Sequence, residues 1–328
     1  MDETAATVGP HEPLKRLEPL KCVIAGGSGS LGRPLADHLA QQGHEVVVLT
    51  RRPSPDLGHR QVRWDGRTVG DWAEELADPS RTAVVNLAGE LVDRSPTHAH
   101  ARLLLDSRVQ PTLALVQASR LGAEPLAHWV QASTTAIWSD GGERRITEST
   151  PLPEPGLPQM TGVARPWEAA SDGAHTSHRV LLRTSLVLQP GSPLLTRLSG
   201  VTRAGLGGRL GSGRQWISWI HVDDWLRVVA ACLDLVPGVR IPSGPLVASS
   251  DRPLRNAEMM AALRARYRRP VGLPAPAFAV RVGARVLGSD PALALTGRHC
   301  TSQVLERAGW SFDVPTFQDA LARIGTAG

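Results

Sequence analysis

The feature that most constrains this chain of 328 residues is a glycine-rich turn near its start. Residues 22–32 read CVIAGGSGSLG, with Gly26, Gly29 and Gly32 spaced three residues apart. An apolar strand that runs into such a turn, followed by a helix, brings bare backbone amides to a phosphate at the helix N-terminus. We therefore expect a strand–turn–helix unit that holds the pyrophosphate of a dinucleotide. The alternative is that the glycines only make a tight turn.

A second apolar strand, expected at 45–49, is followed by Thr50, Arg51 and Arg52. Proteins that bind NAD usually carry an acidic residue at this point, which contacts the ribose 2′-hydroxyl. Two guanidinium groups instead suit a 2′-phosphate, because arginine forms strong charge-assisted hydrogen bonds with phosphate oxygens. The sequence therefore predicts NADP(H) as the cofactor.

Strand and helix patterns alternate through the first 190 residues. Helices are expected at 30–42, 69–77, 97–121 and 158–172, and further strands at 62–64, 82–88, 128–132 and 179–188. This order predicts an α/β protein with a Rossmann-type, doubly wound parallel sheet. We expect a flexible leader at 1–19, the NADP(H)-binding domain at 20–189, and a smaller, mostly helical lobe at 190–328, with helix 222–236 packed on the first domain.

The composition excludes several classes of protein. The formal net charge is +5, but the arginines are scattered and Tyr plus Phe number only four, which gives a nucleic-acid surface little support. Cys22, Cys232 and Cys300 are far apart, which favours reduced thiols in a cytoplasm, and no zinc-ligand spacing occurs. No apolar run reaches the ~18 residues of a membrane span. We expect a cytoplasmic monomer or homodimer that binds a small molecule, with no metal, nucleic acid or membrane.

Further motifs follow one another in a fixed order. They are WDG at 64–66, NLAGE at 86–90, Ser107-Arg108, LLRTSLVL at 181–188, GLGGRLGSGRQ at 205–215 and WIHVDD at 219–224. In this order they resemble the extended short-chain dehydrogenase/reductases, in particular the atypical epimerase family. Its members are relatives of nucleotide-sugar epimerases with an added C-terminal domain of unknown function. The resemblance spans about residues 20–325 and implies an NADP(H)-binding Rossmann-type fold.

The resemblance also implies which residues line the cofactor. Asp65 is placed near the adenine, and the segment after the fourth strand is placed along the dinucleotide. The full set is Gly26, Ser28, Gly29, Ser30, Leu31, Gly32, Thr50, Arg51, Arg52, Asp65, Asn86, Leu87, Ala88, Gly89 and Arg108.

The chain lacks the Tyr-x-x-x-Lys pair with which such enzymes move a proton. In that pair the lysine lowers the pKa of the tyrosine, so that the phenol acts as acid or base near neutral pH. Tyr267 is the only tyrosine and lies in the C-terminal part, while Lys15 and Lys21 both precede the glycine-rich turn. By order in the chain the pair falls within residues 160–165, where Met160 has no proton to give.

Three hydroxyl side chains remain as candidates for the catalytic site. Ser133, Thr134 and Thr135 stand at the end of the fifth strand, where the family's Ser/Thr lies, and Thr134 is the best match. Such hydroxyls can orient a substrate carbonyl, although a hydroxyl alone is a poor general acid near neutral pH. The alternative is that they cap the strand end.

A second group of polar residues points to an anionic substrate. The resemblance places Arg214 and Gln215 where nucleotide-sugar enzymes bind a distal phosphate or sugar, and Arg183 and His221 complete the set. The alternatives are an ion pair of Arg183 with Asp223 or Asp224 between the lobes, and a structural role for His221.

Two functions are compatible with these residues. One is an NADP(H)-dependent oxidoreductase or epimerase-like enzyme that acts on a small, anionic substrate. The other is a catalytically silent protein that binds NADP(H) as a sensor or scaffold. The hydroxyl cluster and residues 205–215 favour the first, and the missing tyrosine and lysine favour the second.

Overall fold

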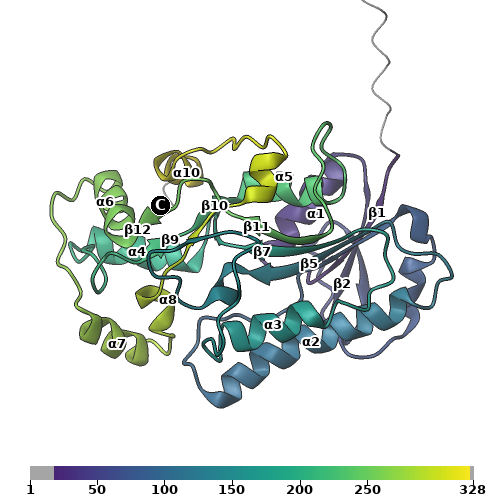
Figure 1. Cartoon of the computed structure of the whole chain (residues 1–328), viewed down its shortest axis with the longest axis horizontal. Helices are drawn as coiled ribbons and strands as arrows, with labels where there is room; N and C mark the ends of the chain where they lie inside the picture. The colour runs from purple at the N-terminus through teal and green to yellow at the C-terminus, as the bar shows by residue number, and fades with distance from the viewer. Residues whose placement is uncertain (1–17, 326–328) are drawn as a thin grey trace, which may run out of the picture.

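The computed structural model describes residues 18–325, so most of the leader expected at 1–19 lies outside the described residues. Seven strands form one sheet in the order β11-β7-β5-β4-β1-β2-β3, and every neighbouring pair is parallel (Figure 1). This confirms the predicted doubly wound parallel sheet. The strands are β1 (Lys21–Ala25), β2 (Glu45–Thr50), β3 (Arg60–Arg63), β4 (Thr82–Asn86), β5 (His128–Thr134), β7 (Arg179–Thr184) and β11 (Gly244–Ala248).

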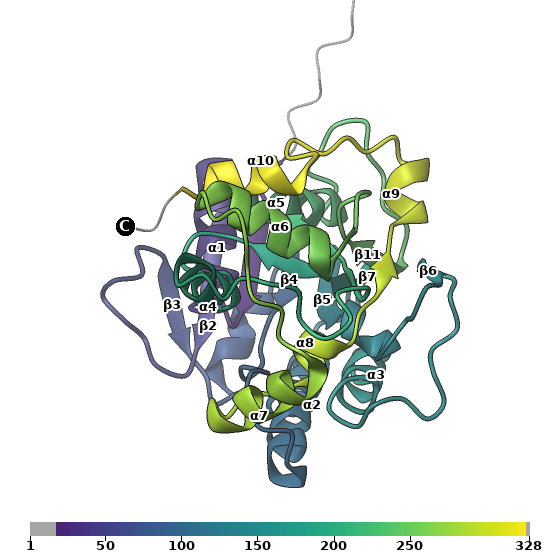
Figure 2. The ribbon, with the colours of Figure 1, turned by 90° about the vertical axis from the view of Figure 1, so that its left-hand side faces the viewer.

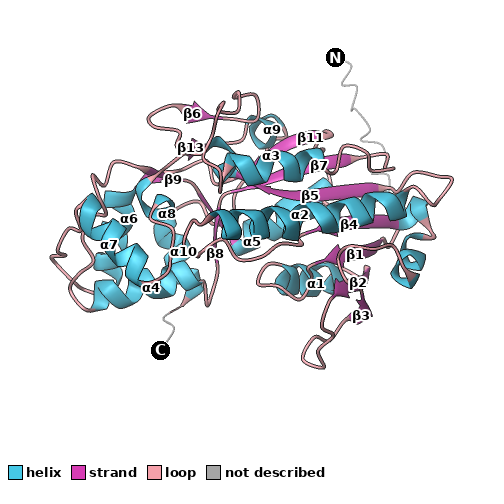
Figure 3. Cartoon of the chain, turned by 90° about the horizontal axis from the view of Figure 1, so that it is seen from below, coloured by secondary structure: helices cyan, strands magenta, loops and turns pink. Residues whose placement is uncertain are grey.

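Helices cover both faces of this sheet (Figure 3). On one face lie α1 (Gly32–Gln41), α5 (Val222–Cys232) and α9 (Gln303–Arg307); on the other lie α2 (His98–Ser119), α3 (Thr161–Ala169) and the 3-10 helices η1 (Asp71–Leu76) and η2 (Pro79–Arg81). Because successive side chains of a strand point to opposite faces, Ile24 packs toward α1 and α5, whereas Val23 packs toward α2. Burial on both faces explains why the strands read as continuous apolar runs.

The strand expected at 179–188 is two strands, because the chain changes partner at Ser185. The backbone N–H of Ser185 donates to Ala248 in β11, but that of Leu186 donates to Ser218. From there β8 (Leu186–Leu188) pairs with β10 (Trp219–His221) in a separate two-stranded sheet. The end of β7 therefore carries the chain out of the large sheet and into a second lobe.

The second lobe has its own core and lies at the carboxyl edge of the large sheet (Figure 2). Trp219, Met260 and Phe317 belong to this core and are almost fully buried. The helices of the lobe are α4 (Pro193–Arg203), α6 (Asn256–Arg266), α7 (Ala277–Val286), α8 (Ala292–Leu295) and α10 (Phe317–Ile324).

Two pairs of short strands hold loops together. They pair as β9 (Trp216–Ile217) with β12 (Leu254–Arg255) and β6 (Arg145–Ile146) with β13 (His299–Cys300). The β6–β13 pair joins the segment after β5 to the segment before α9. Within residues 18–325, no helix has both the length and the apolar character needed to cross a membrane.

Candidate functional site

The three glycines of the turn between β1 and α1 differ in what surrounds them. A Cβ on Gly26 would lie 2.9 Å from the backbone of Leu87, and one on Gly32 would lie 2.5 Å from Gly27 Cα. A Cβ on Gly29 would meet only the Gly26 carbonyl oxygen, at 3.2 Å. The fold itself therefore requires Gly26, with its φ of +78°, and Gly32, whereas the space beyond Gly29 is left open.

The rest of the turn presents backbone to solvent at the start of α1. Gly29 and Ser30 are exposed, while Ser28 and Leu31 are half-buried. Two hydrogen bonds fix Ser28: its Oγ lies 3.3 Å from Thr50 Oγ1, and its carbonyl accepts from Arg33 Nε at 3.1 Å. The turn is thus an open cradle at a helix N-terminus, which fits a pyrophosphate.

Arg51 and Arg52 follow β2 and both are exposed. Thr50, the last residue of β2, is buried, and its Oγ1 accepts from the Arg52 N–H at 3.3 Å. Arg51 Nη2 forms an ion pair with Glu90 Oε1 at 3.0 Å. Since β1 lies between β2 and β4 in the sheet, this pair spans the carboxyl end of β1, where the glycine-rich turn begins.

Asp65 follows β3 and organises its own loop. Its carboxylate accepts from the Thr68 N–H at 2.9 Å, the Arg67 N–H at 2.8 Å and the Thr68 hydroxyl at 2.8 Å. These hydrogen bonds, those of Thr68 first, lower the pKa of Asp65 to about 2. Asp65, Arg51 and Trp64 line a depression of about 650 Å³ at this end of the sheet.

Asn86 shapes the loop that follows β4. It is fully buried, and its Nδ2 donates to Thr112 Oγ1 at 2.8 Å and to Gln131 Oε1 at 3.1 Å. Its Oδ1 accepts from the Ala88 N–H at 3.2 Å. Asn86 therefore fixes residues 87–89 against the glycine-rich turn, and both of its amide N–H donors are used within the protein.

Arg108, on α2, supports the same loop from within the protein. Its guanidinium donates to the carbonyls of Glu90 at 3.0 Å and Leu104 at 3.1 Å, and it lies 5.0 Å from the ring centroid of Trp167. A Cβ on Gly89 would come within 3.0 Å of Arg108 Cζ. Burial lowers the pKa of Arg108 to about 10. In this structure its donors serve the protein's own carbonyls.

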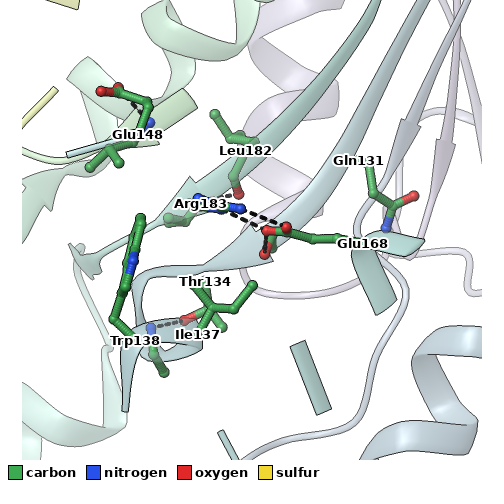
Figure 4. Close-up of polar contacts among 12 residues, drawn as sticks. Gln131, Thr134, Ile137, Trp138, Glu148, Glu168, Leu182 and Arg183 are labelled. Atoms are coloured by element: carbon green, nitrogen blue, oxygen red, sulfur yellow. Dashed lines mark hydrogen bonds and ion pairs between the residues drawn. The ribbon is translucent and has the colours of Figure 1, made fainter. Parts of the chain in front are cut away.

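The three candidate hydroxyls lie at the carboxyl end of β5, next to the 3-10 helix η3 (Thr135–Trp138) (Figure 4). Ser133 Oγ donates to Glu168 Oε1 at 2.6 Å. Thr134 Oγ1 accepts from the Ala136 N–H at 3.1 Å and so caps η3. Thr135 is buried. Because Thr134 acts here as an acceptor, its own hydroxyl proton stays available, whereas that of Ser133 is used on Glu168.

Arg183, on β7, forms a buried ion pair with Glu168 of α3 (Figure 4). Nε lies 2.8 Å from Oε1 and Nη2 lies 2.8 Å from Oε2, and each side chain is less than one-tenth exposed. Trp138 covers the pair, with its ring centroid 4.8 Å from the guanidinium carbon. The expected alternative of a structural ion pair is therefore present, but its partner is Glu168 and neither Asp223 nor Asp224.

Arg214 and Gln215 lie on the second lobe and differ in freedom. Arg214 is 78% exposed, and its Nη2 lies 3.5 Å from Glu143 Oε1. Gln215 Nε2 donates to the carbonyls of Leu210 at 3.0 Å and Ala294 at 2.8 Å, so it holds two loops together. His221 caps the N-terminus of α5, since its Nδ1 accepts from the Asp223 N–H at 3.2 Å. Burial lowers the pKa of His221.

Met160 and Ala164 lie in segment 160–165, where the order of the motifs predicts the missing pair. They stand four residues apart at the start of α3, as the tyrosine and lysine of the motif do, and both are buried. Tyr267 is in the second lobe, where its hydroxyl hydrogen-bonds Ser199 Oγ at 2.9 Å. Neither it nor Lys21, which pairs with Glu75 at 2.7 Å, reaches this site.

One residue at this place was absent from the sequence-based set. Arg298 directly precedes β13, and its Nη1 donates to the carbonyl of Ser139 at 2.6 Å and lies 3.5 Å from Met160 Sδ. No local pattern marks Arg298, because 138 residues separate it from Met160. Only the folded chain brings the two together.

Comparison with known proteins places these features in a family. The model of the NAD dependent epimerase/dehydratase family matches residues 22–240. The chain is similar to epimerase family protein SDR39U1 of Bos taurus, with 28% identity over 93% of this chain and 99% of the relative. It is 31% identical to epimerase family protein Mb2239 of Mycobacterium bovis, over 91% of this chain and 95% of the relative.

Two solved structures have the same fold. The crystal structure of human epimerase family protein SDR39U1 (isoform 2) with NADPH superposes with a TM-score of 0.78 at 26% identity, covering 94% of this chain and 100% of that one. The nucleoside-diphosphate sugar epimerase of Corynebacterium glutamicum gives a TM-score of 0.72 at 26% identity, covering 93% of this chain and 58% of that one.

Proposed function

This chain belongs to the NAD-dependent epimerase/dehydratase family, and from that premise we propose that it is an atypical NADP(H)-dependent short-chain dehydrogenase/reductase. It acts as an oxidoreductase or epimerase-like enzyme on a small, anionic substrate. The nicotinamide supplies the hydride chemistry when NADP(H) is bound. The contributions of the chain itself are to bind the dinucleotide and to orient a substrate carbonyl or hydroxyl.

The observation that carries the proposal is the contrast within the glycine-rich turn. Gly26 and Gly32 are packed against backbone, but the Cβ position of Gly29 opens outward at the N-terminus of α1. A Cβ at Gly29 would meet only one atom of the protein, the Gly26 carbonyl oxygen at 3.2 Å, and a glycine in such an exposed turn fits the close approach of a ligand phosphate. Arg51 and Arg52 stand exposed at the end of β2, and the similar human protein was crystallised with NADPH, which supports NADP(H) over NAD(H).

Within the substrate region, Thr134 is the hydroxyl best placed to act. Its Oγ1 is already an acceptor for Ala136 N–H, which fixes the side chain while leaving the proton to donate to a substrate oxygen. Ser133 is committed to Glu168. A threonine hydroxyl orients and polarises a carbonyl but releases no proton near neutral pH, so a water or the substrate itself must complete the proton transfer.

The second candidate is a silent NADP(H)-binding sensor or scaffold. It is favoured by Met160 and Ala164, which put a thioether and a methyl group where the motif places a phenol and an ammonium. Loss of a positioned acid/base typically costs about 10²- to 10⁴-fold in rate. Both candidates share the cofactor site and differ only in turnover.

Cofactor titration tests the shared part. Energy transfer from tryptophan to the nicotinamide should show that NADPH binds at least about 10-fold more tightly than NADH, because a charge-assisted contact contributes about 1.5–3 kcal/mol. The Arg51→Ala/Arg52→Ala variant should lose that preference, while Arg81→Ala, which alters an exposed arginine at the amino end of β4, should keep it. Equal affinities in the unaltered protein would contradict the NADP(H) assignment.

Turnover separates the two candidates. Small molecules that co-purify with the protein would be identified by mass spectrometry and then tested for oxidation of NADPH or reduction of NADP⁺. An enzyme should turn over at least one of them, with a rate that falls in Thr134→Ala and is unchanged in Tyr267→Phe. Binding of these molecules without any hydride transfer would favour the silent protein.

A further inference from the structure

Arg298 is half-buried and, like Arg108, contacts no carboxylate among the described residues, but Arg108 donates to carbonyls from both Nη1 and Nη2, whereas Arg298 uses Nη1 alone. Arg183 pairs with Glu168, Arg227 pairs with Asp224 and Asp313, and Arg255 pairs with Glu143. Arg298 forms no ion pair with any carboxylate of residues 18–325. Its two contacts, the Ser139 carbonyl and Met160 Sδ, both use Nη1 and carry no charge.

The free edge of Arg298 is the edge that suits an oxyanion. Nε and Nη2 lie side by side and match two oxygens of a carboxylate or phosphate. Arg183 uses this same edge to bind Glu168, with both distances 2.8 Å. In Arg298 no described residue accepts from Nε or Nη2, and neither atom is among the fully buried polar atoms that lack a partner. Both nitrogens therefore keep some exposure on a side chain that is otherwise half-buried.

The surroundings hold Arg298 firmly in this position. Ser139, whose carbonyl anchors Nη1, has the unfavourable φ of +54° and is locked by its own hydroxyl, which accepts from the Leu157 N–H at 2.7 Å and bonds Thr161 Oγ1 at 2.7 Å. A residue other than glycine in this backbone region costs energy and persists only where its surroundings enforce it. Burial lowers the pKa of Arg298, although the nearby Asp140 carboxylate opposes the shift, and a bound anion would offset the remaining cost of burying the cation.

The location connects Arg298 with the proposed chemistry. Met160, which Arg298 touches, takes the place of the tyrosine, and Ala164 takes the place of the lysine. The cation that the motif would supply from α3 is thus supplied by the residue before β13. By contrast, the arginines expected from the sequence are engaged with Glu168 or lie at the surface beside Glu143.

We propose that Arg298 is the anion-binding residue of the substrate site, and that its Nε–Nη2 edge receives a carboxylate or phosphate group of the substrate in two parallel hydrogen bonds. This deepens the function proposed above and rests on it for the identity of the site, but the binding step needs no turnover. A bound anion at this point lies beside Met160 and brings the remainder of the substrate toward the carboxyl end of β5, where Thr134 stands.

The test measures anion binding with two probes, oxalate and inorganic phosphate. Each is titrated into the full chain saturated with NADPH, which fills the cofactor's own phosphate sites, and tryptophan fluorescence and thermal melting are followed. Arg298→Gln should weaken the binding of the preferred probe at least about 10-fold, and Arg298→Lys should restore only part of it, because an ammonium cannot form the bidentate contact. Oxalate preference indicates a carboxylate substrate, and phosphate preference indicates a phosphate ester.

Arg145→Gln is the matched control, because Arg145 lies on β6, the partner strand of β13, and has its own partners in Thr301 and Glu306. It should leave the binding of both probes unchanged. Without probe, Arg298→Gln should lower the melting temperature less than Arg183→Gln does, since no carboxylate loses its partner.

Three results would overturn the proposal: no binding of either probe to the unaltered chain, equal binding in Arg298→Gln, or equal loss in Arg145→Gln. NADPH affinity is recorded in every variant. If NADPH fails to bind even the unaltered chain, the proposed function fails, while the probes still report on Arg298 in the cofactor-free protein.

Discussion

The proposed cofactor side and the proposed substrate side lie at the same edge of the sheet but differ in how many of their polar groups are left free. On the cofactor side, backbone from the glycine-rich turn is exposed and Arg51 and Arg52 project into solvent. On the substrate side, Arg183, Ser133 and Gln215 are consumed by contacts within the protein. On the cofactor side, the absence of a Cβ at Gly29 leaves room for a ligand. On the substrate side, most polar side chains hold α3, β7 and the second lobe in place.

The largest expected effect concerns the substrate side. Arg183→Met should lower the free energy of unfolding by about 3–5 kcal/mol, because it leaves the Glu168 carboxylate buried without its partner. Urea unfolding followed by tryptophan fluorescence measures the loss. The double variant Arg183→Met/Glu168→Gln should recover part of it, since no charge is then stranded. A single variant as stable as the unaltered protein would show that the pair is not structural and would free Arg183 for substrate.

The next effect tests the cofactor side. Gly29→Val should reduce NADPH affinity by at least about 100-fold while the protein stays folded, because the added side chain fills the approach of the pyrophosphate. Gly32→Val is the contrasting variant: its Cβ meets backbone at 2.5 Å, so it should unfold or distort the turn itself. Retained NADPH affinity in Gly29→Val would place the dinucleotide elsewhere and remove the contrast between the two sides.

A smaller effect is expected at Thr134, which caps η3 and is also the hydroxyl proposed to orient the substrate. Thr134→Ala removes the cap of η3 and should cost about 0.5–2 kcal/mol of stability. NADPH affinity should not change. Thr134→Ser, which keeps the hydroxyl, should be close to the unaltered protein in unfolding experiments, and a loss as large as that of alanine would mean that the methyl group matters more than the hydrogen bond.

The smallest effect is a pH dependence that originates far from both sides. Burial lowers the pKa of His128, at the amino end of β5, with Asp234 opposing the shift and His178 adding to it. The unfolded chain then binds more protons than the folded one just below the ordinary histidine pKa of about 6.5, so stability falls as the pH drops through that value. Melting curves at a series of pH values measure the slope.

Asp65 and Glu143 affect stability in a more acidic pH range of the same experiment. Hydrogen bonds hold the pKa of each carboxyl at about 2, those of Thr68 leading at Asp65 and that of Arg255 leading at Glu143. Any stability they contribute is present above the unfolded pKa of about 4 and is lost only as the pH falls through the folded value. His128→Gln should therefore reduce the slope between about pH 7 and 5, while the other histidines whose pKa burial lowers, His38, His44, His221 and His299, keep the rest of it.

The parts of the fold that follow from local sequence were predictable. The glycine spacing between β1 and α1 and the apolar runs of β2 and β4 depend on neighbours within a few residues, and the parallel sheet follows from their order. The absence of the catalytic tyrosine at Met160 was predictable too, because the order of the family motifs along the chain predicts its position. Such features need no knowledge of distant contacts.

What could not be predicted depends on partners far along the chain. The break at Ser185 arises because its neighbours bond to β11 and β10, and β11 itself is only five residues long and contains Pro245. The use of Arg183 is decided by Glu168 on another element. Arg298 meets Met160 across both lobes, so that no window of sequence contains both.

The return of the chain to the sheet at β11 means that the second lobe is an insertion and not an appendage. The chain leaves after β7, comes back with α5 and β11, and leaves again at β12. A fragment that ends at residue 189 would lack α5 over one face and would leave β7 as an open edge, with unpaired backbone groups that invite aggregation. Neither lobe can therefore be cut away at a single point, and the dinucleotide-binding half is completed only after much of the other half has been made.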